Sequence, residues 1–226
     1  DCAIAGVDGT AGELKVNFLD PAGSKTGKLF PTGQAKETLE LGEFGTIEAT
    51  ILDVSNPIVL VRAADVGADA NKTLSAKLEA IRGAACVRMG FAKDLADATA
   101  NSPAVPKVGF VTAPVTFTDI SGKTVQAEEM DICARVISVF KCHKACPLTS
   151  ASSISVAAFV PGTIVHELAK HAPGQQTTRI GHPSGVMTLY PYMDDPSKPL
   201  NEINVSGVAV QRTARRIMDG TLYIRK

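Results

Sequence analysis

The sequence contains no tryptophan, and aromatic residues make up only 5% of its 226 residues. Its 23 lysines and arginines are balanced by 23 acidic side chains, so the formal net charge is zero. Proteins that bind nucleic acid need a basic surface, and those that bind single strands also need aromatic side chains on which bases stack. The composition therefore gives no reason to expect a nucleic-acid partner.

The sequence also lacks any run of about 18 consecutive apolar residues, which is what a membrane-spanning helix needs. It begins at Asp1 without a methionine and without the charged and apolar regions of a signal peptide, so we expect no secretion signal. Such a start indicates processing, truncation or proteolysis. The five cysteines are odd in number and unevenly spaced, unlike a secreted disulfide framework. We therefore expect a reducing, cytoplasmic location and no membrane partner.

Short strand-like segments dominate the chain. Apolar residues make up 45% of it and charged residues 20%, which suits a chain with a packed core and argues against disorder. Alternating or β-branched runs, separated by Gly, Pro and Asp, predict strands. The predicted strands cover residues 14–19, 46–51, 57–66, 107–117, 132–140, 177–180, 186–190, 203–210 and 221–224.

Helices are predicted to be few. Residues 74–89 carry apolar side chains with the 3.6-residue period of an amphipathic helix. Residues 148–160 contain no charged side chain, which predicts a helix that is buried on all sides. Pro147 suits its first turn, and Pro161 ends it. A shorter helix is predicted at 163–171.

Two motifs resemble known sites but fail their spacing rules. A phosphate-binding loop at 23–28 would need glycine where Ala22 stands and Ser or Thr where Leu29 stands. His166 and His171 resemble a zinc-protease helix, but they are five residues apart. On a helix this spacing separates them by roughly 140°, so they cannot share a metal ion. Neither motif predicts a site.

Zinc and serine-hydrolase chemistry are weakly supported. Cys133, Cys142, His143 and Cys146 are zinc-binding residue types, but Cys133 lies in the middle of a predicted strand, and buried structural cysteine is common. A Ser–His–acid triad would be expected on a Gly-x-Ser-x-Gly turn, and no such turn occurs. We expect no metal site and no catalytic triad.

The segment 141–151 is the most informative part of the sequence. Lys141 and His143 precede the charge-free helix, whose first turn carries Thr149 and Ser150. A helix N-terminus presents unpaired N–H groups and a partial positive charge, so it attracts carboxylates. These four residues are therefore candidate substrate-binding residues. Ordinary helix capping beside solvated lysines is an equally good local interpretation.

Two polar turns add further candidates. Asn56 lies between two predicted strands, and its side-chain amide offers both a donor and an acceptor to a carboxylate. Ser184 and Gly185 lie in the turn 181–185 at the end of another strand. Plain turn chemistry is the alternative interpretation of both segments.

Taken in order, the motifs resemble the PrpF family, which is distantly related to diaminopimelate epimerase. The resemblance runs through most of the chain and rests on the segments 19–24, 26–33, 53–57, 81–82, 89–90, 106–108, 131–135, 143–145, 161–163, 182–185 and 212–220.

The resemblance implies an α+β fold of two similar halves. Each half is an antiparallel, β-barrel-like sheet wrapped around a central buried helix, and the active site lies in the cleft between them. On this basis the chain is the C-terminal half only. Residues 1–33 would be the tail of the missing N-terminal domain and the inter-domain segment, and residues 34–226 the C-terminal domain.

The resemblance also implies a cofactor-free isomerase of small unsaturated di- or tricarboxylic acids such as 2-methylaconitate, aconitate or methylitaconate. Such enzymes remove a proton beside a conjugated carboxylate and return it elsewhere. The lysine and cysteine usually held responsible would lie in the missing half. Pro147 stands where relatives carry a second cysteine, and we do not assign the base role to Cys146.

The expected partners are the carboxylate substrate and the missing N-terminal half, and homo-oligomers are left open. The alternative function is a non-catalytic fragment or carboxylate-binding lobe.

Overall fold

The computed structural model describes residues 1–67, 71–139 and 141–224, with the side chains of 71–73 left out. Its strands are β1 Gly12–Leu19, β2 Glu37–Glu40, β3 Thr46–Val54, β4 Asn56–Arg62, β5 Lys107–Thr112, β6 Phe117–Thr118, β7 Thr124–Val125, β8 Ile132–Ser138, β9 Lys141–Cys142, β10 Thr178–His182, β11 Gly185–Met193 and β12 Val205–Ala214. Its helices are η1 Gly42–Phe44, α1 Ala63–Val66, α2 Asn71–Arg88, α3 Leu95–Asn101, η2 Ala127–Glu129, α4 Leu148–Ala157 and α5 Ile164–Leu168.

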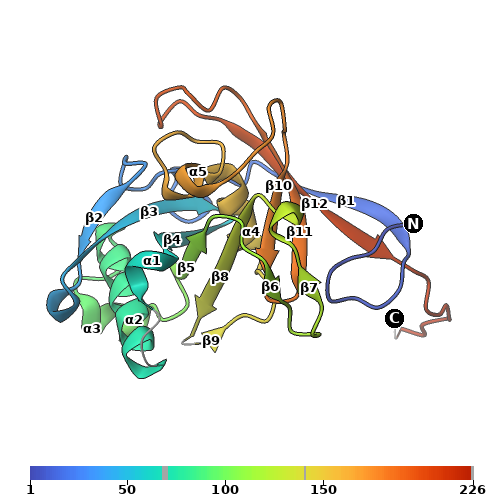
Figure 1. The fold of residues 1–226 in the computed structure, drawn as a ribbon, viewed down its shortest axis with the longest axis horizontal. Helices are drawn as coiled ribbons and strands as arrows, with labels where there is room; N and C mark the ends of the chain where they lie inside the picture. Colours follow the sequence, from blue (N-terminus) through green and yellow to red (C-terminus); the bar gives the residue numbers. More distant parts are fainter. Residues whose placement is uncertain (68–70, 140, 225–226) are drawn as a thin grey trace.

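One ten-stranded sheet forms the body of the protein (Figure 1). Its strand order is β1-β12-β11-β10-β8-β5-β4-β3-β2, and β9 pairs with the far end of β8. The pairs β4–β5 and β8–β10 are parallel, and the other pairs are antiparallel. The sheet is mixed. It is also open, because within the described chain its two edge strands, β1 and β2, each pair with a neighbour on one side only. The predicted α+β fold is confirmed, but barrel closure is not seen.

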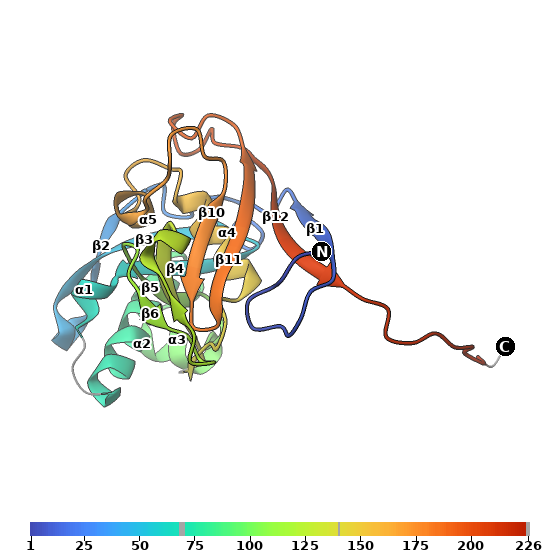
Figure 2. The same ribbon diagram turned by 45° about the vertical axis from the view of Figure 1, so that its right-hand side comes forward.

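The helix α4 crosses one face of the sheet, as Figures 1 and 2 show from two directions. The face that α4 covers is called the inner face, and the opposite one the outer face. Every residue from Ser150 to Ala157 is buried, and the helix packs against β3, β4, β10 and β11. Two of its serine hydroxyls are satisfied within the helix. Ser152 Oγ donates to Leu148 O at 3.0 Å, and Ser155 Oγ donates to Ser152 O at 2.9 Å. A charge-free helix can therefore be buried on all sides, as predicted, although it ends three residues earlier, at Ala157.

The helix α2 packs on the opposite, outer face. Leu78, Ile81 and Ala85 are buried in a second core cluster against the outward-facing residues of β3, β4 and β5. The amphipathic helix predicted at 74–89 is thus confirmed and begins a little earlier, at Asn71. The short helices α1 and α3 were not predicted, and both lie near α2 (Figure 1). None of the helices in the described chain has the length and hydropathy to cross a bilayer.

The two ends of the chain are the least packed parts. Strand β1 pairs with β12, yet all eight of its residues are exposed. The last described segment leaves the sheet as an extended tail (Figure 2), and its apolar residues Ile217, Leu222 and Tyr223 are more than 80% exposed. The strand predicted at 221–224 is wrong, because that segment pairs with no strand of the described chain. Phe140, at the predicted end of β8, lies outside the described residues.

Candidate functional site

One end of the sheet gathers most of the predicted site residues. Strands β4 and β5 are parallel and begin there, whereas β8 and β10 are parallel to each other and end there. The β3–β4 turn with Asn56, the β9 segment with Lys141, and the β10–β11 turn with Ser184 are therefore all at this end. The polypeptide then enters α4 from β9, so the N-terminus of α4 lies beside these turns.

The N-terminus of α4 has unused hydrogen-bonding capacity. Its first intrahelical bond runs from Ala151 N to Pro147 O at 2.8 Å. Pro147 occupies the N-cap position and provides no side-chain cap, and the N–H groups of Leu148, Thr149 and Ser150 have no partner within the described ranges. Ser150 Oγ is buried and also lacks a partner there. Since orphan N–H groups and a buried hydroxyl both call for a hydrogen-bonding partner, this end is suited to an anionic ligand.

Strand register decides which side chains share the face of α4. Ile58 and Val136 contribute to the core around α4. Lys107 pairs with Ile58, and the N–H of His143 donates to Val136 O, which extends the β8–β9 ladder. Because paired residues project on the same face and successive residues alternate, Lys107, Lys141 and His143 lie on the inner face with α4. Asn56 precedes Ile58 by two residues and also lies on this face, roughly 8 Å from Lys107 between Cα atoms.

The same alternation separates the cysteines. Cys133 and Cys142 project from the outer face, where Cys133 belongs to a small cluster around Met130, whereas Cys146 is buried in the inner core beside α4. Arg135, which donates to Cys133 Sγ at 3.3 Å, also lies on the outer face. These thiols therefore do not converge, and no group of three or more His, Cys, Asp or Glu in the described chain is arranged to hold a metal ion.

Lys107 is the main electrostatic feature of this inner face. No carboxylate of the described chain forms an ion pair with it. Burial lowers the pKa of Lys107. Burial also raises the pKa of Cys146 to about 12, against the opposing influence of Lys107, so Cys146 is held as a neutral thiol. A partly buried ammonium without a counter-ion, close to a helix N-terminus, creates a positive local potential.

His143 is held in its neutral form. Burial lowers its pKa, and the positive charge of Lys107 lowers it further. Its Nε2 atom is buried and has no hydrogen-bond partner in the described part of the chain. The cationic character of this site therefore comes from Lys107 and the exposed Lys141 rather than from His143.

The turn that carries Asn56 is fixed from two sides. Ser55 has a φ of 63°, which gives the chain a sharp reversal between β3 and β4. On the inner side, Ser153 Oγ of α4 donates to Val54 O at 3.2 Å. On the other side, Asp53 is fully buried and its carboxylate accepts four hydrogen bonds from the loop 24–26. The loop that resembles a phosphate-binding motif thus binds a carboxylate of its own chain.

The Ser184 turn is tied to the segment before α4. Ser184 Oγ donates to Lys144 O at 2.5 Å, and its N–H donates to His182 Nδ1 at 3.2 Å. Burial lowers the pKa of His182 to about 4. Gly185 has a φ of 126°, and a Cβ at this position would lie only 2.8 Å from Ala5 Cβ. The N-terminal loop therefore covers this turn, and the Ser184 hydroxyl is engaged within the protein.

Lys107 is the site residue that the sequence did not single out. Its proximity to α4 depends on the parallel pairing of β4 with β5, which brings together segments about fifty residues apart. A signal was present: Lys107 occupies an inward-facing position at the start of a strand whose later inward-facing residue, Val111, is buried in the core.

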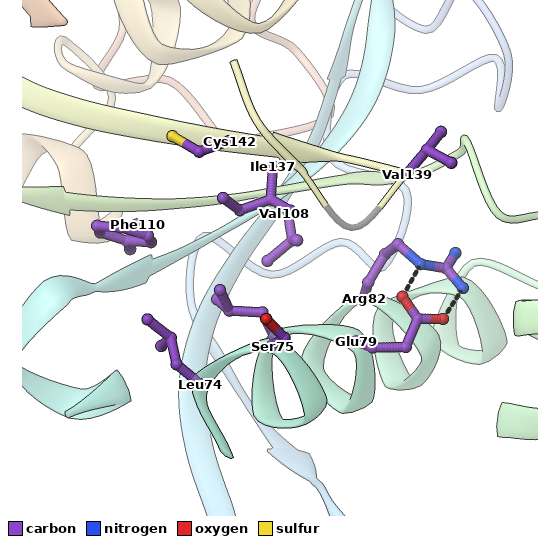
Figure 3. Close-up of a pocket in the computed structure, with 10 residues that line it drawn as sticks. Leu74, Ser75, Glu79, Arg82, Val108, Phe110, Ile137, Val139 and Cys142 are labelled. Carbon is purple, nitrogen blue, oxygen red and sulfur yellow. Dashed lines mark hydrogen bonds and ion pairs between the residues drawn. The ribbon is translucent and has the colours of Figure 1, made fainter. Parts of the chain in front are cut away.

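A separate hollow of about 310 Å³ lies on the outer face, between α2 and strands β5, β8 and β9 (Figure 3). It is lined mainly by apolar side chains, including Leu74, Val108 and Ile137. Its buried cation, Arg82, is already neutralised by two hydrogen bonds to the Glu79 carboxylate and also donates to Ser102 O. This hollow thus offers no unpaired buried charge to an anion, unlike the site at α4.

Sequence and structure comparisons agree with this fold, which is that of an α+β protein whose sheet wraps a buried helix. The family model of the PrpF protein matches residues 1–225. The chain therefore belongs to the PrpF family.

Its relatives include 3-methylitaconate isomerase of Eubacterium barkeri, with 36% identity over 100% of this chain and 60% of that protein. The 2-methyl-aconitate isomerase of Shewanella oneidensis is 32% identical over 100% of this chain and 59% of that protein. A crystal structure of methylitaconate-delta-isomerase superposes with a TM-score of 0.85 at 36% identity, covering 97% of this chain and 57% of that one.

The chain spans about 60% of the length of these curated relatives. The prediction that it corresponds to the C-terminal half only is not borne out, because the family match covers nearly the whole chain from its first residue and the relatives align over all of it.

Proposed function

We propose that this protein is a cofactor-free isomerase of small unsaturated di- or tricarboxylic acids, and that the N-terminus of α4 binds one of the substrate carboxylates. The observation that carries the proposal is the buried Ser150 hydroxyl beside the N–H groups of Leu148, Thr149 and Ser150, all of them without a partner among the residues that the structure describes. The names of the relatives, which act on methylitaconate and 2-methylaconitate, support this class of substrate.

In this proposal each residue has a defined role. Thr149, Ser150 and the adjacent N–H groups donate hydrogen bonds to one carboxylate. Lys107 and Lys141 supply the positive charge that stabilises an enolate as it forms. Asn56 orients a second carboxylate from the β3–β4 turn, whereas Ser184 holds the segment that enters α4.

The chemistry needs only proton transfer. Removing the proton from the carbon between a carboxylate and a double bond gives an extended enolate. Returning a proton at the far end of the double bond moves that bond, and rotation before its return changes the geometry instead. No electrons leave the substrate, so this reaction requires no redox cofactor. It does require stabilisation of negative charge and a group that carries the proton.

Isothermal titration calorimetry with 3-methylitaconate tests the proposal. Ser150→Ala should weaken binding about 10- to 150-fold, because a hydrogen bond to a charged group contributes about 1.5–3 kcal/mol. Ser152→Ala is the matched control, since its hydroxyl donates to Leu148 O within the same helix, and its affinity should match that of the unmodified chain. Equal affinities of all three proteins would exclude α4 as the carboxylate site.

The alternative, a lobe that binds acids but has no activity, predicts the same binding results. Incorporation of solvent deuterium into 3-methylitaconate separates the two alternatives. Only an isomerase removes the carbon-bound proton of this acid and so exchanges it with solvent.

A further inference from the structure

A hollow of about 670 Å³ lies where the two ends of the open sheet come close to each other. One wall belongs to the loop 27–33, which the chain enters after β1, and the other is the segment 200–205, which leads into β12. This space is named the seam hollow. No residue of α4, and none of the residues assigned to the site at its N-terminus, lines it. The seam hollow is therefore separate from the site already described.

The two walls are attached to different parts of the sheet. The loop wall is bound to β3, because Asp53 N donates to Leu29 O at 2.9 Å. The other wall is bound to the end of β11, because Asp194 N donates to Asn204 O at 3.1 Å. Within the described chain no hydrogen bond joins the two walls directly. The space between them is thus not bridged by polar groups of the protein itself.

The loop wall offers hydrogen-bond donors that the protein leaves unused. The N–H groups of Leu29 and Phe30 have no partner among the described residues, although both residues are more than 90% buried. The hydroxyl of Thr32 is buried and also lacks a partner there. Lys28 is the one charged residue among the described residues that line the hollow, and it takes part in none of the ion pairs found in that part of the chain. Buried donors normally have acceptors, so these groups favour an anionic ligand.

Much of the remaining lining is apolar. Leu29 and Phe30 on the loop wall, and Ile203 and Val205 on the other wall, all belong to the hydrophobic core around α4. A ligand with an apolar body would therefore extend this core and remove its own apolar surface from water. Inorganic phosphate has no such body, so the combination of a cation, free N–H groups and apolar walls favours an organic acid.

We propose that the seam hollow is a second ligand site, which binds a small organic acid. The carboxylate lies against Lys28 and the N–H groups of Leu29 and Phe30, and the apolar body lies against Ile203 and Val205. Because both walls contribute contacts, the bound acid links the loop that is fixed to β3 with the segment that leads into β12. The site does not depend on the proposed function, since α4 contributes no lining residue.

An NMR titration of the isotope-labelled chain with 3-phenylpropionate tests this site, and 3-phenylpropionamide is the uncharged counterpart. At the backbone signals of Leu29 and Phe30 we expect a Kd of about 1 mM or lower for the acid, and a value about fivefold higher for the amide. Lys28→Met should weaken the acid about fivefold and leave the amide unchanged. Lys25→Met is the matched control, because Lys25 is exposed in the same part of the chain but does not line the hollow. It should bind the acid like the unmodified chain.

Ser150→Ala separates the seam hollow from the site at α4. The Kd for the acid at the Leu29 and Phe30 signals should be the same in Ser150→Ala as in the unmodified chain. The proposal is overturned if these signals do not respond to the acid, if acid and amide bind equally well, or if Lys28→Met keeps the full affinity. A response at Leu29 and Phe30 that Ser150→Ala abolishes would assign the acid to α4 and also overturn it.

Discussion

Replacing Asp53 by alanine should destabilise the protein, because its carboxylate joins a loop to the β3–β4 turn. Its side chain is fully buried and accepts from Lys25 N and Thr26 N at 2.8 Å and from the hydroxyls of Ser24 and Thr26 at 3.0 Å. Each hydrogen bond to a charged group is worth about 1.5–3 kcal/mol, but the exposed loop donors regain water when the carboxylate is lost. We therefore expect a net loss of about 2–4 kcal/mol.

Urea unfolding measures this loss as a decrease in the free energy of unfolding. In a chain of this size, a loss of about 2–4 kcal/mol should lower Tm by roughly 4–16 °C. Asp119→Ala is the control. Asp119 accepts three hydrogen bonds of similar length within its own turn, from Ser121 and Lys123, but all of them are exposed, so the cost should stay below about 1 kcal/mol. Equal losses in the two variants would show that burial adds nothing, which would refute the reasoning.

Two further predictions concern pH and backbone geometry. His182 has its pKa lowered to about 4 in the folded protein, against about 6.5 when unfolded. The unfolded state therefore takes up the proton first, and stability should be constant above pH 6.5 and fall by about 3 kcal/mol as the pH drops to 4. His182→Gln should lack this decrease in urea unfolding measured at pH 7 and pH 4; an unchanged slope would mean that another group titrates. Gly23 and Gly27 both have positive φ. A Cβ on Gly23 would lie 2.6 Å from backbone atoms of Gly27 and Lys28, whereas a Cβ on Gly27 would meet no atom within 4 Å. Gly27→Ala should cost about 1 kcal/mol and Gly23→Ala clearly more, so equal unfolding midpoints would contradict the close contact.

The buried helix was predictable because its signal is local. A segment of ten or more residues without charge can satisfy its backbone as a helix and has no polar face to turn toward water, so α4 follows from composition alone. The strand predicted at 221–224 shows the limit of the same approach. Its residues have the propensity for a strand, but a strand also needs a neighbour, and propensity does not supply one.

The site was predictable only in part, for the same reason. Thr149 and Ser150 are close to the helix start in sequence, so their placement needed no tertiary information. Lys107 reaches that helix only through strand pairing between distant segments. The loop 23–28 could be excluded as a phosphate site from its sequence, but its actual partner, Asp53, is a long-range contact that the sequence does not reveal.

Strand β1 has a consequence for the behaviour of the chain in solution. Its outer edge leaves main-chain N–H and C=O groups unpaired within the described structure, and Leu14, Val16 and Phe18 form an apolar row along one face. An extended segment that meets this edge can gain main-chain hydrogen bonds and apolar contact at the same time. Association of this chain should therefore increase with its concentration, and a lysine in place of Val16 should suppress it.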